Sequence, residues 1–231
     1  MNIPFRRLLA LSCTLSLTVL LAQAQEKDKE AEKKDKEPAK SAEKKDKEPT
    51  KPAENEVARP LSESTLYPLK VGNTWYYKAG DNYFMIKVAE LKEVEGKPRA
   101  RLDLIINNKV ISNETVGLTK DGLVRYTFEG KEAKPPIEFL RLPPKSGTSW
   151  KLESKVEGAS LKGTFKAGEE EVRVPAGSFK AVTVTGTDID ANNVKMNLTY
   201  FFAEKVGMVK QIIELGGQKI VVELEKFELA K

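Results

Sequence analysis

The stretch YFMIKVAELKEVEGKPRARLDLII, residues 83–106, decides the fold. Phe84, Ile86 and Val88 occupy every second position, and after an EG dipeptide the same spacing resumes at Ala100. Apolar residues at every second position are typical of a β-strand with one buried face, because successive side chains point to opposite faces. The stretch therefore predicts two strands joined by a tight turn.

The same pattern continues to the end of the chain, and no part of residues 60–231 shows an apolar stripe with the period of a helix. Short turn-forming dipeptides separate the alternating runs. We therefore expect one all-β domain over residues 60–231, an antiparallel meander of about 10–12 strands that forms a strongly curved sheet or a barrel. The expected turns are Gly80-Asp81, Glu95-Gly96, Asn107-Asn108, Asp121-Gly122, Glu129-Gly130, Asn192-Asn193 and Gly216-Gly217.

A repeated phrase divides this domain. PLKVGNTW, which ends at Trp75, returns as PPKSGTSW, which ends at Trp150, 75 residues later. A second phrase around Gly122 returns around Gly207, 85 residues later. Self-similarity of this kind indicates repeated architecture.

The repeats predict two similar halves, residues 66–140 and 141–231. A proline-rich interval, residues 134–149, lies between them. Proline has no N–H for a sheet ladder, so this interval cannot be a central strand throughout. We expect it to mark the boundary between the halves.

The two tryptophans, Trp75 and Trp150, are the candidate ligand-binding residues. Exposed indole rings could stack a sugar or another flat ligand. Alternatively, both rings are buried and organise the packing around them. The matching turns favour the structural interpretation, because a ligand platform seldom needs its turn duplicated.

Residues 1–24 resemble a secretory signal peptide. Arg6 and Arg7 precede an apolar stretch over residues 8–22, and Ala22 and Ala24 provide a small-x-small cleavage site. Cleavage there would leave no membrane span and would remove Cys13, the single cysteine. Lipidation at Cys13 is the alternative, but this cysteine lies within the apolar stretch rather than after it. We expect an exported protein, periplasmic or extracellular.

Residues 25–59 predict a disordered, charged linker. AEKKDKEPAKS, residues 31–41, is followed by AEKKDKEPTKP, residues 42–52. Charge of both signs without large apolar residues cannot offset the entropy cost of folding. We interpret the segment as a solvated spacer, with contact between its lysines and anionic wall polymers or lipid headgroups as the alternative.

The composition excludes several kinds of chemistry. The chain has no histidine, which excludes Ser-His-Asp and Cys-His catalysis and histidine-ligated metals. The net charge of +5 is spread over alternating lysine and glutamate rather than gathered on one face, so nucleic-acid binding is not expected. No sequence feature calls for a cofactor.

Other polar motifs have structural explanations. Asp188, Asp190 and Asn192 resemble the first half of a calcium loop, but Asn193 and Thr199 stand where the loop needs glycine and glutamate. The acidic run at residues 169–171 reads as a solvated strand entry, and Ser178 in the VPAGSF turn has no base beside it. We therefore expect no metal site and no catalytic residue.

Three motifs in order give a resemblance. YPLKVGNTWYY (67–77), EVRVPAGSFKAVTV (171–184) and YFFAEKVGMVKQ (200–211) resemble a group of uncharacterised secreted β-sheet domains of Gram-negative-type bacteria, which share PLxxGNxW, VPAGxF and VGxVK. The resemblance implies the fold and the compartment, and no catalytic residue. These domains are similar in outline to the periplasmic lipoprotein-carrier half-barrels, which hold helices against a curved sheet. This chain shows no such helices.

The expected function is therefore a non-catalytic role in binding or scaffolding at the cell envelope, with an unknown envelope component as partner. Two alternatives stay open. The curled sheet could carry a lipid or another apolar ligand, or paired carboxylates could serve a histidine-free hydrolase.

Overall fold

The computed structural model describes residues 65–231, so the expected signal peptide (1–24) and charged linker (25–59) lie outside the described residues. Twelve β-strands make up the described part of the chain. They are β1 (Thr74–Ala79), β2 (Asn82–Val94), β3 (Lys97–Ile106), β4 (Lys109–Leu118), β5 (Gly122–Phe128), β6 (Lys131–Arg141), β7 (Ser149–Val156), β8 (Ala159–Val174), β9 (Gly177–Ala191), β10 (Val194–Ala203), β11 (Gly207–Leu215) and β12 (Gln218–Glu228).

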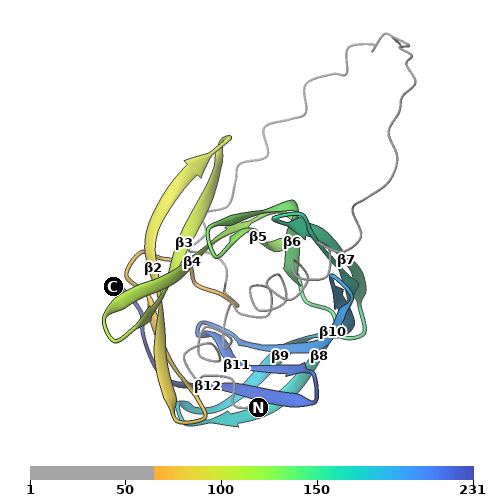
Figure 1. Ribbon diagram of the computed structural model, residues 1–231. Helices are drawn as coiled ribbons and strands as arrows, with labels where there is room; N and C mark the ends of the chain where they lie inside the picture. Colours follow the sequence, from red (N-terminus) through yellow and green to blue (C-terminus); the bar gives the residue numbers. More distant parts are fainter. Residues whose placement is uncertain (1–64) are drawn as a thin grey trace, which may run out of the picture.

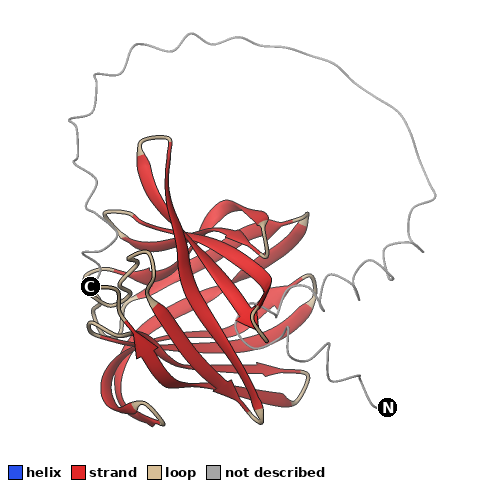
Figure 2. Ribbon diagram, turned by 90° about the vertical axis from the view of Figure 1, so that its left-hand side faces the viewer, coloured by secondary structure: helices blue, strands red, loops and turns tan. Residues whose placement is uncertain are grey.

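The strands form a closed antiparallel barrel (Figures 1 and 2). Each strand pairs with the next in sequence, and β12 pairs with β1 to close the ring. The predicted all-β meander is confirmed, and all seven expected turns lie at strand junctions. The β2–β3 hairpin extends beyond the body of the barrel (Figure 1).

Alternation along the strands separates the inner and outer faces. In β7, Trp150, Leu152 and Val156 are buried, whereas Lys151 and Lys155 are exposed. Buried residues of this kind from all twelve strands belong to one apolar core. The hydrophobic contribution of this core favours closure of the sheet.

The repeated phrase forms the same turn at both positions. In each copy a main-chain N–H donates to the carbonyl of the phrase's lysine: Asn73 to Lys70 at 3.0 Å, and Thr148 to Lys145 at 3.1 Å. The glycines have φ values of 94° at Gly72 and 85° at Gly147, which only glycine adopts readily.

The strands after these turns differ in length. β7, β8 and β9 have 8, 16 and 15 residues, whereas β1, β2 and β3 have 6, 13 and 10. The connecting turns are equally short in both sets. The longer strands thus explain why the second phrase recurs after 85 residues, whereas the first recurs after 75. Origin of the two sets of six strands in a duplication, with halves 66–140 and 141–231, stays a prediction.

The junction of β6 and β7, here called the seam, is paired differently from the rest of the ring. Main-chain pairing covers only Ala133 with Val156 and Lys134 with Lys155. Pro135 and Pro136 follow and supply no N–H. Side chains of β7 continue the junction: Ser154 Oγ donates to the Pro135 carbonyl at 2.6 Å, and Trp150 Nε1 donates to the Glu138 carbonyl at 2.9 Å.

The main chains of β5 and β6 approach closely at Gly122, where β5 begins, and a substitution at this residue tests how closely. Its φ is 151°, and a Cβ there would lie 2.0 Å from the Leu140 carbonyl oxygen. We expect Gly122→Ala to lower the free energy of unfolding by about 2 kcal/mol, because the two main chains must separate. Urea denaturation measures the loss.

The control for this substitution is Gly216→Ala. Gly216 has a φ of 58°, and a Cβ added there would have nothing within 4 Å, so only the backbone conformation is penalised, at about 1 kcal/mol. Equal losses in the two variants would show that the close approach at Gly122 is relieved without cost.

Candidate functional site

A buried ion pair lies inside the barrel. Glu114 of β4 and Arg125 of β5 both point to the inner face, since Glu114 is opposite Phe128 and Arg125 is opposite Val116 in the β4–β5 ladder. The Arg125 Nε and Glu114 Oε2 atoms are 2.6 Å apart. Neither atom has an aligned hydrogen-bond partner among the described residues, so the contact is one of charge.

Tyr200 and Gln211 extend this pair into a polar cluster, defined here as Glu114, Arg125, Tyr200 and Gln211. Burial acts to lower the pKa of the Arg125 guanidinium, but the charge of Glu114 and contact with Tyr200 outweigh burial and raise the pKa above its ordinary value. Gln211 lies opposite Tyr200 in the β10–β11 ladder, and its Oε1 is buried without a hydrogen-bond partner among the described residues. The polar cluster joins strands that are not neighbours in the ring.

An aromatic cluster fills the interior beside it. Phe139 of β6 lies between residues from distant parts of the ring, with ring centroids 6.5 Å from Tyr67, 6.3 Å from Tyr200 and 6.2 Å from Phe202. Tyr67 in turn lies 5.3 Å from Trp75. The Arg125 guanidinium lies 5.0 Å from the Phe139 ring centroid, within the range of a cation–π contact. At this level of the barrel, side chains from different strands are in contact with one another.

The two candidate tryptophans are buried, with exposed fractions of 0% for Trp75 and 4% for Trp150. Trp75 Nε1 donates to the Val206 carbonyl at 2.6 Å, and Trp150 Nε1 donates to the Glu138 carbonyl across the seam. Each indole N–H therefore has a main-chain partner, as a buried tryptophan requires. These positions support the structural interpretation, and a ligand role for either ring stays a prediction.

The three residues that resemble a calcium loop have separate partners. Asp188 occupies an irregularity in β9 with a φ of 51°, and its N–H donates to Asn197 Oδ1 at 2.9 Å. Asp190 Oδ1 accepts the Asn193 N–H at 2.8 Å, and Asn192 Oδ1 accepts the Ser160 N–H at 2.9 Å. In residues 65–231, no group of three or more acidic side chains could hold a metal ion.

Asp190 gives a pH-dependent prediction. The Asn193 N–H and Lys195 hold the pKa of its carboxyl below the ordinary value. Since the folded pKa is lower than the unfolded one, the stability contributed by Asp190 is present above the unfolded pKa and is lost as the pH falls through the folded pKa. We expect Asp190→Ala to be less stable than the parent at neutral pH, and the difference to shrink on acidification below about pH 4.

Urea denaturation over a pH series measures this difference. Asp190→Asn is the matched control, because its amide oxygen still accepts the Asn193 N–H but does not titrate. A difference between the parent and Asp190→Ala that stayed constant into strong acid would contradict the assignment.

The other carboxylates do not form an isolated pair in the interior. Among the described residues, the buried acidic side chains are Asp103 and Glu114. Asp103 Oδ1 lies 3.2 Å from Arg101 Nε, and Glu114 faces Arg125. The run at residues 169–171 is exposed to solvent, as expected from the sequence, but it lies within β8 rather than at the entry to a strand.

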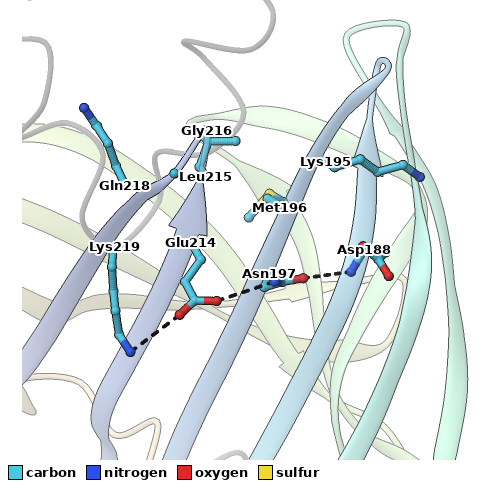
Figure 3. Close-up of a pocket in the computed structure, with 10 residues that line it drawn as sticks. Asp188, Lys195, Met196, Asn197, Glu214, Leu215, Gly216, Gln218 and Lys219 are labelled. Atoms are coloured by element: carbon cyan, nitrogen blue, oxygen red, sulfur yellow. Dashed lines mark hydrogen bonds and ion pairs between the residues drawn. The ribbon is translucent and has the colours of Figure 1, made fainter.

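An open pocket of about 360 Å³ lies at the ends of β9 to β12 (Figure 3). Its polar side chains contact one another: Asn197 Nδ2 donates to Glu214 Oε2 at 3.4 Å, and Glu214 Oε1 lies 3.5 Å from Lys219 Nζ. Asp188 and Lys195 complete the charged part of the wall. The pocket wall carries charges of both signs, and several of them already contact one another. The wall therefore does not favour one chemical class of ligand.

Sequence reasoning missed the polar cluster. The only signal was a charged or amide residue at an inward position of an otherwise apolar alternation. A β-bulge at Tyr126 of β5 hides that signal, because the register shifts between Arg125 and Thr127. The buried positions of β5 therefore change from odd, at Leu123 and Arg125, to even, at Phe128.

Two crystal structures are similar to this chain. One is a protein of Bacteroides fragilis described as exported and as having a YmcC-like fold; it is 13% identical with a TM-score of 0.44, and the match covers 71% of this chain and 99% of that one. The other is a protein of Parabacteroides distasonis described as a lipoprotein; it is 10% identical with a TM-score of 0.43, and the match covers 71% of this chain and 98% of that one. No protein-family model and no curated protein matches the chain. Membership in the secreted domain group indicated by the three motifs stays a prediction.

Within the described residues, no helix has the length and apolar character needed to cross a bilayer.

Proposed function

We propose that this chain is an exported, non-catalytic β-barrel domain that acts in binding or scaffolding at the cell envelope. The observation that carries the proposal is the contact of Phe139 with Tyr67, Tyr200 and Phe202 inside the barrel. Interior side chains that contact each other leave the outer face as the surface for a partner. Export is supported by the signal-like residues 1–24.

The non-catalytic part of the proposal rests on the chemistry of the side chains. The chain has no histidine, and the buried carboxylates of Asp103 and Glu114 are each matched with an arginine. A carboxylate-based hydrolase needs two carboxyls that face the substrate. Among the described residues, Glu114 forms a buried ion pair and Asp103 is paired with the half-exposed Arg101, which supports a non-catalytic role.

Carriage of an apolar ligand is the second candidate, and the polar cluster favours it. Gln211 Oε1 has no hydrogen-bond partner among the described residues, and the Arg125 guanidinium lies near it through Tyr200. A ligand with an apolar body and a hydroxyl or N–H group would match such surroundings, because a buried amide oxygen requires a hydrogen-bond donor.

Native mass spectrometry of the protein recovered from its own cells tests both functions. For a scaffold, we expect a bare mass that corresponds to a chain beginning at Gln25. A retained lipid mass that disappears in Gln211→Leu, while the urea midpoint shows that this variant is folded, would instead establish the carrier. An uncleaved chain in the cytoplasmic fraction would contradict export.

A further inference from the structure

The outer face of the barrel carries an apolar row that crosses four strands. Tyr76 of β1 is opposite Met85 of β2, Met85 is opposite Ile105 of β3, and Ile105 is opposite Val110 of β4. These four residues are called the apolar row. Tyr76 lies between the buried Trp75 and Tyr77, and alternation therefore directs the row outward.

The row ends at exposed side chains near two turns. Val110 and Ile111, beside the β3–β4 turn, have exposed fractions of 55% and 50%, and Tyr83, beside the β1–β2 turn, has 59%. Val110 faces outward opposite Ile105, Tyr83 is two residues from Met85 on the same face, and Ile111 is the extra residue of a bulge beside Val110. Neighbouring strands lie about 4.8 Å apart, so these side chains are within reach of a single flat partner.

The fold does not require an apolar row. By the spacing of the two tryptophans, Lys151 of β7 corresponds to Tyr76 of β1. Lys151 is opposite Thr164 of β8, and Thr164 is opposite Thr187 of β9. Asn197 of β10 lies opposite the irregularity that follows Thr187. The equivalent row in the other six strands is therefore polar throughout, which makes the apolar row a property of β1 to β4.

Lysines without acidic partners surround the apolar row. Lys78 and Lys87 point to this face, since Lys78 is two residues from Tyr76 and Lys87 is two residues from Met85, and neither forms an ion pair with a described acidic side chain. Asp103, which is opposite Lys87, is paired with Arg101. The Lys78 Nζ atom lies 5.6 Å from the centroid of the Tyr83 ring. Exposed aliphatic side chains, a tyrosine and unpaired lysines together match the boundary between anionic headgroups and acyl chains.

We propose that this face of β1 to β4 binds the surface of an anionic phospholipid bilayer, with Tyr83, Val110 and Ile111 entering the headgroup region and Lys78 and Lys87 contacting phosphates. The proposal rests on the envelope location given above. A second copy of the chain is a poorer occupant, because a symmetric contact would bring the two lysines near their own copies. A bilayer offers negative charge over the whole face.

Vesicle sedimentation tests the proposal on the processed chain recovered from cells, whose N-terminus is read by mass spectrometry. We expect binding to vesicles that contain phosphatidylglycerol, weaker binding to pure phosphatidylcholine, and release by salt. The variant Y83S/V110S/I111S should bind about tenfold more weakly, because the apolar anchors are lost. K78Q/K87Q should lose at least as much, since each lysine near an anionic surface contributes about fivefold.

Matched controls remove the same chemistry elsewhere. L91S/V94S/L229S replaces three other exposed apolar side chains, and K151Q/K155Q replaces two unpaired lysines of β7. Both should bind within about twofold of the parent, and urea midpoints show that all variants are folded.

Three outcomes would overturn the proposal. They are no sedimentation of the parent, equal losses in the test and control variants, and a lipid-free dimer that Y83S/V110S/I111S dissociates. A chain that is neither exported nor cleaved contradicts the envelope location instead, and the N-terminal mass separates that failure from the others.

Discussion

Replacing Glu114 with glutamine is expected to lower the free energy of unfolding by about 3 to 5 kcal/mol. Glu114 and Arg125 are both buried, and Glu114 supplies the charge that accompanies the guanidinium inside the barrel. Without it, Arg125 keeps a buried charge that cannot be lost, because the guanidinium remains protonated. Urea denaturation followed by tryptophan fluorescence measures the change.

The double variant E114Q/R125M is the matched control. It removes both charges, and a buried ion pair often costs as much to desolvate as it returns, so the double variant should be more stable than E114Q alone. If E114Q unfolds within about 1 kcal/mol of the parent, the pair is hydrated in solution and the interior is wetter than the aromatic cluster indicates.

Trp75→Ala and Trp150→Ala are each expected to cost about 3 to 5 kcal/mol of stability, because each removes a large buried ring and leaves a main-chain carbonyl without its donor. The carbonyls are those of Val206 for Trp75 and Glu138 for Trp150. Denaturation curves followed by far-UV circular dichroism measure both losses, because this signal does not depend on the tryptophan that each variant lacks.

Trp75→Phe and Trp150→Phe separate packing from the hydrogen bond. They retain an aromatic ring without an N–H, and we expect a smaller cost than for alanine. A ligand platform predicts the opposite pattern: almost unchanged stability in both alanine variants, with loss of a bound mass in native spectra.

Much of the fold could be predicted because its signals are local. Seven turn dipeptides and a period of two placed the strands, and both signals come from neighbouring residues. The repeated lysine–glycine–tryptophan phrase likewise encodes its own turn, as the matching φ values of Gly72 and Gly147 indicate. Strand number and antiparallel order follow from such signals without knowledge of long-range contacts.

The interior could not be predicted, because its contacts are long-range. Arg125 and Tyr200 come from β5 and β10, and their facing directions depend on bulges that no local pattern marks. The apolar row has the same origin. Tyr76, Met85, Ile105 and Val110 become one row only through the register of three strand pairs.

The seam between β6 and β7 has a further consequence for the ring. Beyond Lys134 and Lys155 the two strands have no ladder, so the barrel contains two facing strand edges, which in other β proteins recruit extended segments and promote aggregation. Here the carbonyls of Pro135 and Glu138 already accept hydrogen bonds from Ser154 and Trp150. An incoming strand would find these acceptors occupied and the N–H of each proline missing, and the second tryptophan thereby protects the chain against self-association.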